Sequence, residues 1–150
     1  MSIVSGLAAE IYDLEVAEAT GAARNTEVVL ISGWLEANIG TLNLLINSSF
    51  CAGDLTATGH QEERAIIREL YNVKMFEKRG LNVLKGADGS SSDMDFQTLR
   101  EGDSVITRSN RNTVAANYRK LQERAEMELK DLVHNYNMYH SKQSQIYGDD

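Results

Sequence analysis

The stretch Thr113–Tyr139, TVAANYRKLQERAEMELKDLVHNYNMY, carries the clearest helical pattern in the chain. Its apolar and aromatic side chains recur every three or four residues, which is close to the heptad pattern of helices that pack lengthwise. These positions are Val114, Tyr118, Leu121, Ala125, Leu129, Leu132, Tyr136 and Tyr139. The pattern predicts one long helix that begins between residues 110 and 113, ends near Tyr139 and turns this stripe toward other helices.

Two helices are expected in the first third of the chain. Residues 2–19 carry an apolar stripe at helical spacing, formed by Ile3, Leu7, Ile11, Leu14 and Ala17. Residues 20–25 read as a connection in which Gly21 caps the first helix. Thr26 is the expected N-cap of a second helix that continues to about Asn47.

The second predicted helix contains two glycines, Gly33 and Gly40, which lie on one face because they are seven residues apart. Each costs about 1 kcal/mol in a helix interior relative to alanine. We therefore expect another helix to approach closely there. Val28–Ile31 alone is compatible with a strand, but the length of the whole pattern favours helix. Trp34 is expected in the core.

A third helix is predicted from about Gly59 to Lys78, with an extension to Leu84. Thr58 and Gln61 form a capping-box pattern at its start. Gly80 is a potential break that would divide this helix in two. The side chains expected to be buried across the four helices are Trp34, Leu42, Ile66, Leu70, Tyr118, Leu121 and Leu132.

An extended arm and a tail complete the prediction. Glycine, serine and aspartate dominate residues 86–93, so the arm at 86–109 starts as a loop. Val105–Thr107 is β-prone but too short for a sheet without a partner. Residues 141–150 form a tail whose apolar anchors are Ile146 and Tyr147. We expect arm and tail to be mobile in the free subunit and ordered in an assembly.

The predicted architecture is an all-α bundle of four to five helices, with residues 1–140 as a single domain. The 150-residue chain contains no proline, which suits long helices. No stretch approaches the roughly 18 to 20 apolar residues of a bilayer span, so no membrane partner is expected. No basic region followed by an apolar run marks a secretory signal at the start, and the single cysteine, Cys51, excludes an internal disulfide.

The net charge of −7 is unevenly placed. Residues 1–59 carry seven acidic residues and one basic residue, whereas residues 60–86 carry four acidic and six basic residues. A protein that binds duplex DNA tightly needs a clustered basic face, which this chain lacks. Contact with passing DNA is still compatible with the charge. Asp131 and His134 lie one helical turn apart but supply only a fragment of a di-metal bundle site, so we expect no metal, no cofactor and no enzymatic activity.

One segment carries a resemblance to a known family. Arg100–Asn112 reads REGDSVITRSNRN and leads into Ala115–Leu121 (AANYRKL) and Leu129–Asn137 (LKDLVHNYN). This order of a Gly-Asp-Ser turn, an extended arm and a long helix resembles the small helical head-to-tail connector (adaptor) proteins of tailed bacteriophages. Ser32–Asn43 is similar to the early helix of that group, and Arg64–Tyr71 would be its middle helix.

The resemblance implies a structural virion protein, assembled in the host cytoplasm, with no reaction and no cofactor. Such connectors form an oligomeric ring, commonly of twelve copies, beneath the portal protein. The ring extends the DNA channel without reading the DNA sequence and docks the next neck or tail protein. The resemblance suggests that partners meet the arm, at residues 94–107, and the C-terminal tail. The residues predicted for partner contact are Asp103, Arg108, Arg111, Ile146 and Tyr147.

Two other functions fit the same residues. In the first, the chain is a helical adaptor or regulator that binds a partner helix through residues 113–139. In the second, it is a metal-dependent helical-bundle enzyme built around His134. For Arg108 and Arg111, a capping and surface role is the alternative to contact with a phosphate backbone.

Overall fold

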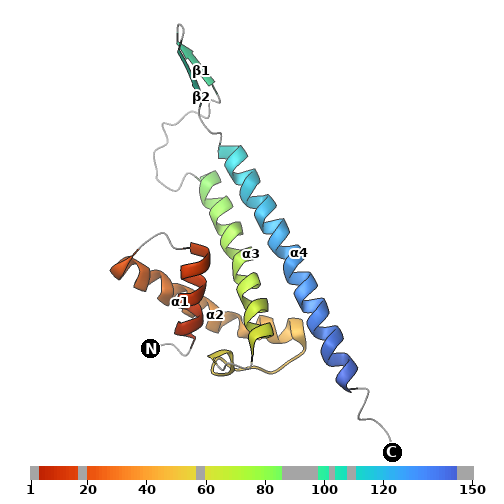
Figure 1. The fold of residues 1–150 in the computed structure, drawn as a ribbon. Helices are drawn as coiled ribbons and strands as arrows, with labels where there is room; N and C mark the ends of the chain where they lie inside the picture. Colours follow the sequence, from red (N-terminus) through yellow and green to blue (C-terminus); the bar gives the residue numbers. More distant parts are fainter. Residues whose placement is uncertain are drawn as a thin grey trace, which may run out of the picture. The chain divides into compact units, whose positions relative to one another are not determined.

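The computed structural model describes residues 4–16, 20–56, 60–85, 98–101, 104–107 and 111–144. Within them, the α-helices are α1 (Ser5–Ile11), α2 (Gly21–Ile46), α3 (Gln61–Lys85) and α4 (Arg111–Ser144). The strands are β1 (Thr98–Glu101) and β2 (Ser104–Thr107), and short π and 3-10 turns follow α1 and α2 (Figure 1). Helices account for more than half of the chain, which confirms the predicted helical class.

The chain divides into two compact units. The first consists of Met1–Tyr71 together with Met127–Asp150, and the second consists of Asn72–Glu126. Both α3 and α4 therefore contribute one part to each unit. The first unit is discontinuous in sequence, because its final segment comes from the end of α4.

The first unit contains the hydrophobic core. α1, one face of α2, the start of α3 and the end of α4 contribute to it, and Leu55 in the 3-10 turn Asp54–Thr56 fills it further. The core side chains include Leu7, Ile11, Tyr12, Ile31, Leu35, Leu42, Ile66, Ile67 and Tyr136. Leu42 and Ile66 are fully buried, as predicted, whereas Trp34, Leu70, Tyr118 and Leu132 are partly buried.

The first helix ends sooner than predicted and changes register. α1 gives way at Tyr12 to a π-helical turn over Tyr12–Val16. A π turn holds more residues than an α turn, so the inward face moves to Tyr12, which is fully buried. Leu14, expected in the apolar stripe, is exposed as a result.

The second helix begins earlier than predicted. Residues 21–25 are helical, so Gly21 is the first residue of α2 and not the cap of the helix before it. The Thr26 hydroxyl does not cap a helix and instead donates to the carbonyl of Ala22. Arg24 holds this first turn in place, because its guanidinium donates to both carboxylate oxygens of Asp13 at 2.9 and 2.7 Å.

Among the described helices, α2 alone is long and apolar enough to cross a membrane, judged by length and composition. This differs from the expectation that no stretch approaches a bilayer span. The core helix of a protein in water meets the same criteria, and one face of α2 lies in the core of the first unit. The α2 helix ends at Asn47, whose positive φ of 48° forms a left-handed cap.

The third helix is continuous and does not break at Gly80. It runs from Gln61 to Lys85. A Cβ built at Gly80 would lie 3.4 Å from the Cβ of Tyr118, so the glycine lets α3 and α4 approach closely within the second unit. Gly80 therefore has a packing role.

The fourth helix matches the prediction in type but differs in register and length. Leu121 was expected to be buried, yet 43% of its surface is exposed. Gln122 lies on the inward face of α4 in place of Leu121, and Ala125, one turn after Leu121, is buried. The helix also continues through residues 141–144, the beginning of the segment expected to be a tail.

The two strands lie within the predicted arm and form an antiparallel pair. Thr98 is opposite Thr107, and Glu101 is opposite Ser104, so two residues connect the strands. Val105–Thr107 thus has the partner strand that the sequence did not reveal.

Candidate protein-docking groove

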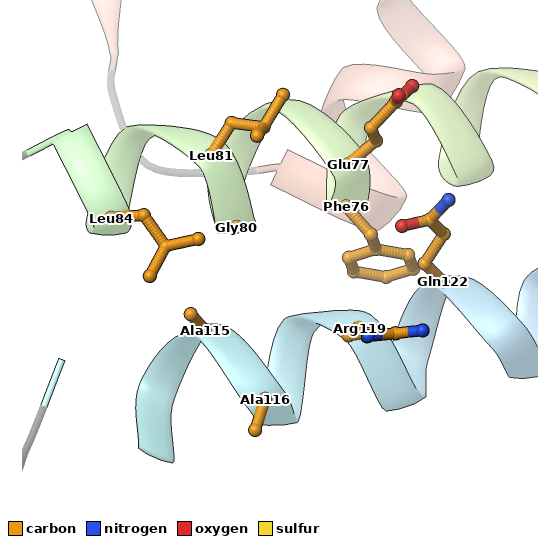
Figure 2. Close-up of a pocket in the computed structure, with 9 residues that line it drawn as sticks. All are labelled: Phe76, Glu77, Gly80, Leu81, Leu84, Ala115, Ala116, Arg119 and Gln122. Atoms are coloured by element: carbon orange, nitrogen blue, oxygen red, sulfur yellow. The ribbon is translucent and has the colours of Figure 1, made fainter. Parts of the chain in front are cut away.

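An open groove lies in the second unit, between the last turns of α3 and the first turns of α4 (Figure 2). Its volume is about 380 Å³. The residues that line it, which we call the hairpin groove, are Phe76, Glu77, Gly80, Leu81, Leu84, Ala115, Ala116, Arg119 and Gln122.

Small residues create the groove and leucines border it. Gly80 and the alanines Ala115 and Ala116 leave space between the two helices where larger side chains would fill it. Leu81 and Leu84 remain exposed although both are apolar. Exposed leucines beside a hollow are typical of a surface that binds another apolar group.

The polar groups gather at one end of the groove. Figure 2 shows Gln122 and Arg119 near Phe76, and Leu84 at the opposite end beside Ala115. Arg119 pairs with Glu123 at 3.3 Å, and Gln122 donates to Glu126 at 3.0 Å. The ion pair is exposed, so it costs little to exchange it for a contact with a partner.

The lining chemistry suits binding. Most of the residues that line the groove are apolar, and the polar ones are Glu77, Arg119 and Gln122. An apolar floor with charged groups at one end fits an apolar protein segment with a polar flank.

A second polar feature lies in the first unit and consists of Tyr136 and Glu63, which we call the tyrosine–glutamate clasp. The buried Tyr136 hydroxyl donates to Oε1 of buried Glu63 at 2.8 Å. Burial, and then this bond to a carboxylate, raise the pKa of Tyr136 above its usual range. His60 Nδ1 lies 3.7 Å from the same oxygen, and the His140 ring lies 4.2 Å from the Tyr136 ring. The clasp joins α3 to α4.

The remaining predicted site residues are not brought together in the described structure. Asp103, Arg108, Ile146 and Tyr147 lie outside the described residues, as does the side chain of Arg111, the first residue of α4. The predicted mobility of the arm and tail also concerns residues that lie outside the described ones.

The other candidates for chemistry lie on the surface. Asp131 and His134 are both exposed on α4, and the described part of the chain holds no group of three potential metal ligands. Cys51 is exposed, and its thiol lies 3.1 Å from Oδ2 of Asp54. The Cys51 backbone N–H and then its thiol lower the pKa of Asp54.

Comparisons with protein-family models, with curated proteins and with solved structures found no match to this chain.

Proposed function

We propose that this chain is a structural virion protein of a tailed bacteriophage, a head-to-tail connector. It forms a ring beneath the portal, extends the DNA channel and docks the next neck or tail component. The observation that carries the proposal is the order of elements in the resembling segment. The strands β1 and β2, which the prediction described only as an extended arm, precede the long helix α4 in the segment that carries the resemblance.

Exposed apolar surface supports an assembling role. The leucines of the hairpin groove and of the outer face of α2 are exposed in the single chain. A ring has heterologous contacts, so each copy needs two different faces. The acidic residues 1–59 and the mildly basic residues 60–86 supply charges of opposite sign for such faces.

The charge also suits a channel. DNA that slides through a ring must not be bound tightly, and tight binding depends on clusters of lysine and arginine that displace counterions. With a net charge of −7, the chain repels phosphate on average.

In this proposal the hairpin groove receives an apolar segment of the portal protein. The groove is formed by the last turns of α3 and the first turns of α4, which flank the arm in the sequence. The arm is the region that the resemblance assigns to partner contact. A portal segment with an apolar residue for Leu84 and an acidic residue for Arg119 would match the two ends of the groove.

Electron microscopy and portal binding test the proposal together. The chain should form closed rings, alone or on the portal encoded in the same genome. Leu84→Glu should weaken portal binding at least tenfold and leave the helical spectrum unchanged. Leu14→Glu is the matched control, because Leu14 is equally apolar and exposed but lies in the first unit. Absence of rings both with and without the portal would refute the connector function.

A helical adaptor is the second candidate, favoured by the exposed Leu121 and Met127 on α4. The part of the α4 stripe that a partner helix could contact is smaller than the sequence predicted, because Ala125 and Tyr136 of this stripe are buried in the fold. An adaptor would lose its partner in a Leu121→Glu variant and would form no ring. Portal and major capsid genes beside this gene would favour the connector.

A further inference from the structure

A polar pocket lies in the first unit, between α1 and the start of α3. Its volume is about 360 Å³, and it shares no residue with the hairpin groove. Residues three or four positions apart on a helix share a face, and in this way α1 contributes two side chains and α3 contributes four. The lining residues, which we call the arginine pocket, are Leu7, Glu10, Gln61, Arg64, Ala65 and Arg68.

The two arginines of the pocket differ in their partners. Arg64 Nη2 donates to Oε2 of Glu10, so this guanidinium already has a carboxylate. Arg68 is in no ion pair within the part of the chain that the structure describes, and its Nε is buried without a hydrogen-bond acceptor. A buried donor without an acceptor costs free energy, and the cost is greater when the donor belongs to a charged group. The Arg68 guanidinium is therefore the group that an added acceptor would stabilise most.

The charges of the pocket favour a ligand with a single negative charge. Two guanidinium groups and one carboxylate line it, so one positive charge remains. The two oxygens of a carboxylate match the planar guanidinium in a bidentate geometry. A phosphate dianion would be repelled more strongly by Glu10, and duplex DNA needs a cluster of basic residues that this pocket lacks.

We propose that the arginine pocket binds a carboxylate group, which accepts hydrogen bonds from the Arg68 guanidinium while Glu10 holds Arg64 in place. Leu7 and Ala65 contact the short apolar stem that carries the carboxylate. Because Nε of Arg68 is buried, the guanidinium turns toward the pocket when the ligand enters. The carboxylate belongs to an acidic side chain of another protein chain or to a small carboxylic acid. The site goes beyond the connector function and does not rest on it.

The NMR signal of the Arg68 Nε–H group tests the contact in the full-length chain. Propionate, a carboxylate on a short apolar stem, should shift this signal until the site is saturated, whereas chloride at the same ionic strength should not. The signal is identified by its loss in an Arg68→Lys variant. Arg24 is the internal control, because its Nε already donates to Asp13 at 2.9 Å and should not respond. A chain whose Arg68 signal shows no saturable shift would overturn the proposal.

Substitutions of Arg68 test whether its guanidinium supplies the affinity, which the backbone amide signals of the pocket measure. Arg68→Gln should abolish propionate binding, and Arg68→Lys should weaken it at least tenfold, because an ammonium group lacks the bidentate fork. Arg119→Gln is the matched control, since Arg119 is an exposed arginine of the second unit. Circular dichroism checks that each variant is folded. Wild-type affinity in either Arg68 variant would contradict the proposal.

Glu10 gives a prediction of opposite sign. Glu10→Gln removes the negative charge of the pocket and releases Arg64, so propionate should bind more tightly than to the wild type. Inorganic phosphate, a weak ligand of the wild type, should gain more affinity than propionate does. Weaker propionate binding in this variant would show that the charge argument is wrong.

A comparison of ligands identifies the source of the carboxylate. Tighter binding of a terminally blocked Gly-Glu-Gly peptide than of propionate indicates a side chain of another protein chain, and equal or weaker binding indicates a small carboxylic acid. Inorganic phosphate or duplex DNA that saturates the wild-type site at lower concentration than propionate would refute the carboxylate. Rings without a propionate-induced shift would refute the pocket alone, and a shift without rings would refute the connector alone.

Discussion

Glycines occur in the interior of both α2 and α3, and they have different explanations. Gly80 in α3 lies against Tyr118 of α4, so its missing side chain is used within the chain. Gly33 and Gly40 in α2 face open space among the described residues. A glycine inside a helix thus marks a close approach of two helices at Gly80, whereas the same residue type at Gly33 and Gly40 has no such neighbour among the described residues.

The largest difference in stability is expected between substitutions on the two sides of α2. Leu42→Ala should lower the free energy of unfolding by about 2 to 5 kcal/mol, because Leu42 is fully buried and its removal leaves a cavity. Leu44→Ala, two residues later on the exposed side, should change it by about 0.5 kcal/mol or less. Urea unfolding measures both, and equal losses would mean that the side of α2 that carries Leu44 belongs to the core.

The tyrosine–glutamate clasp should contribute the next largest effect. Tyr136→Phe removes the hydroxyl that bonds the buried Glu63 carboxylate and should cost about 1.5 to 3 kcal/mol. Tyr139→Phe, on the exposed side of the same helix turn, is the control and should be close to neutral. A neutral Tyr136→Phe variant would show that water or His60 replaces the hydroxyl.

A third pair of variants compares substitutions at Gly80 and Gly33 directly. Gly80→Leu should destabilise the fold by about 1 to 3 kcal/mol, because a Cβ at residue 80 already lies 3.4 Å from the Cβ of Tyr118 and a longer side chain has to displace this neighbour or enter the hairpin groove. Gly33→Leu should leave the free energy of unfolding unchanged or slightly raised, since a Cβ at residue 33 meets no atom of the described residues within 4 Å. Thermal unfolding of both variants checks this, and a destabilised Gly33→Leu would place an unrecognised neighbour at α2.

The smallest effect concerns acid pH. The hydrogen bonds from Arg24 lower the pKa of Asp13 in the folded chain below its unfolded value of about 3.9. The stability from this pair is therefore present above that value and is lost as the pH falls through the folded pKa. Asp13→Asn should be slightly less stable than wild type at neutral pH, and the difference should shrink below about pH 4. A difference that stays constant to pH 2 would contradict this account of the pair.

Helix positions could be predicted where apolar residues recur regularly, and the prediction failed where the local helix geometry changes. α3 and α4 are helices where the three-and-four spacing predicted them, although Leu121 of the α4 stripe is exposed. The π turn at Tyr12–Val16 shifts the register of the first helix in a way that spacing alone does not encode. Arg24 in the first turn of α2 donates to Asp13 of the preceding segment, and the spacing of apolar residues carries no signal for this interaction.

The candidate site was less predictable than the fold, because its parts are distant in sequence. Gly80 and Ala115 form one groove only after α3 and α4 pack together. Glu63 and Tyr136 are 73 residues apart, and neither belongs to a recognisable motif. The exposed Leu81 and Leu84 were the available signal, since they lie at the end of the third predicted helix, next to the arm.

The discontinuous first unit has a consequence for the nascent chain. Tyr136 bonds Glu63, and the Asn137 amide donates to the carbonyl of Leu45 at 3.0 Å, so the end of α4 closes a core built from much earlier residues. Translation at about 5 to 20 residues per second delivers Tyr136 several seconds after Glu63. During that interval the apolar surface that α4 later covers is exposed, and folding of the first unit is completed only after the end of α4 has been synthesised.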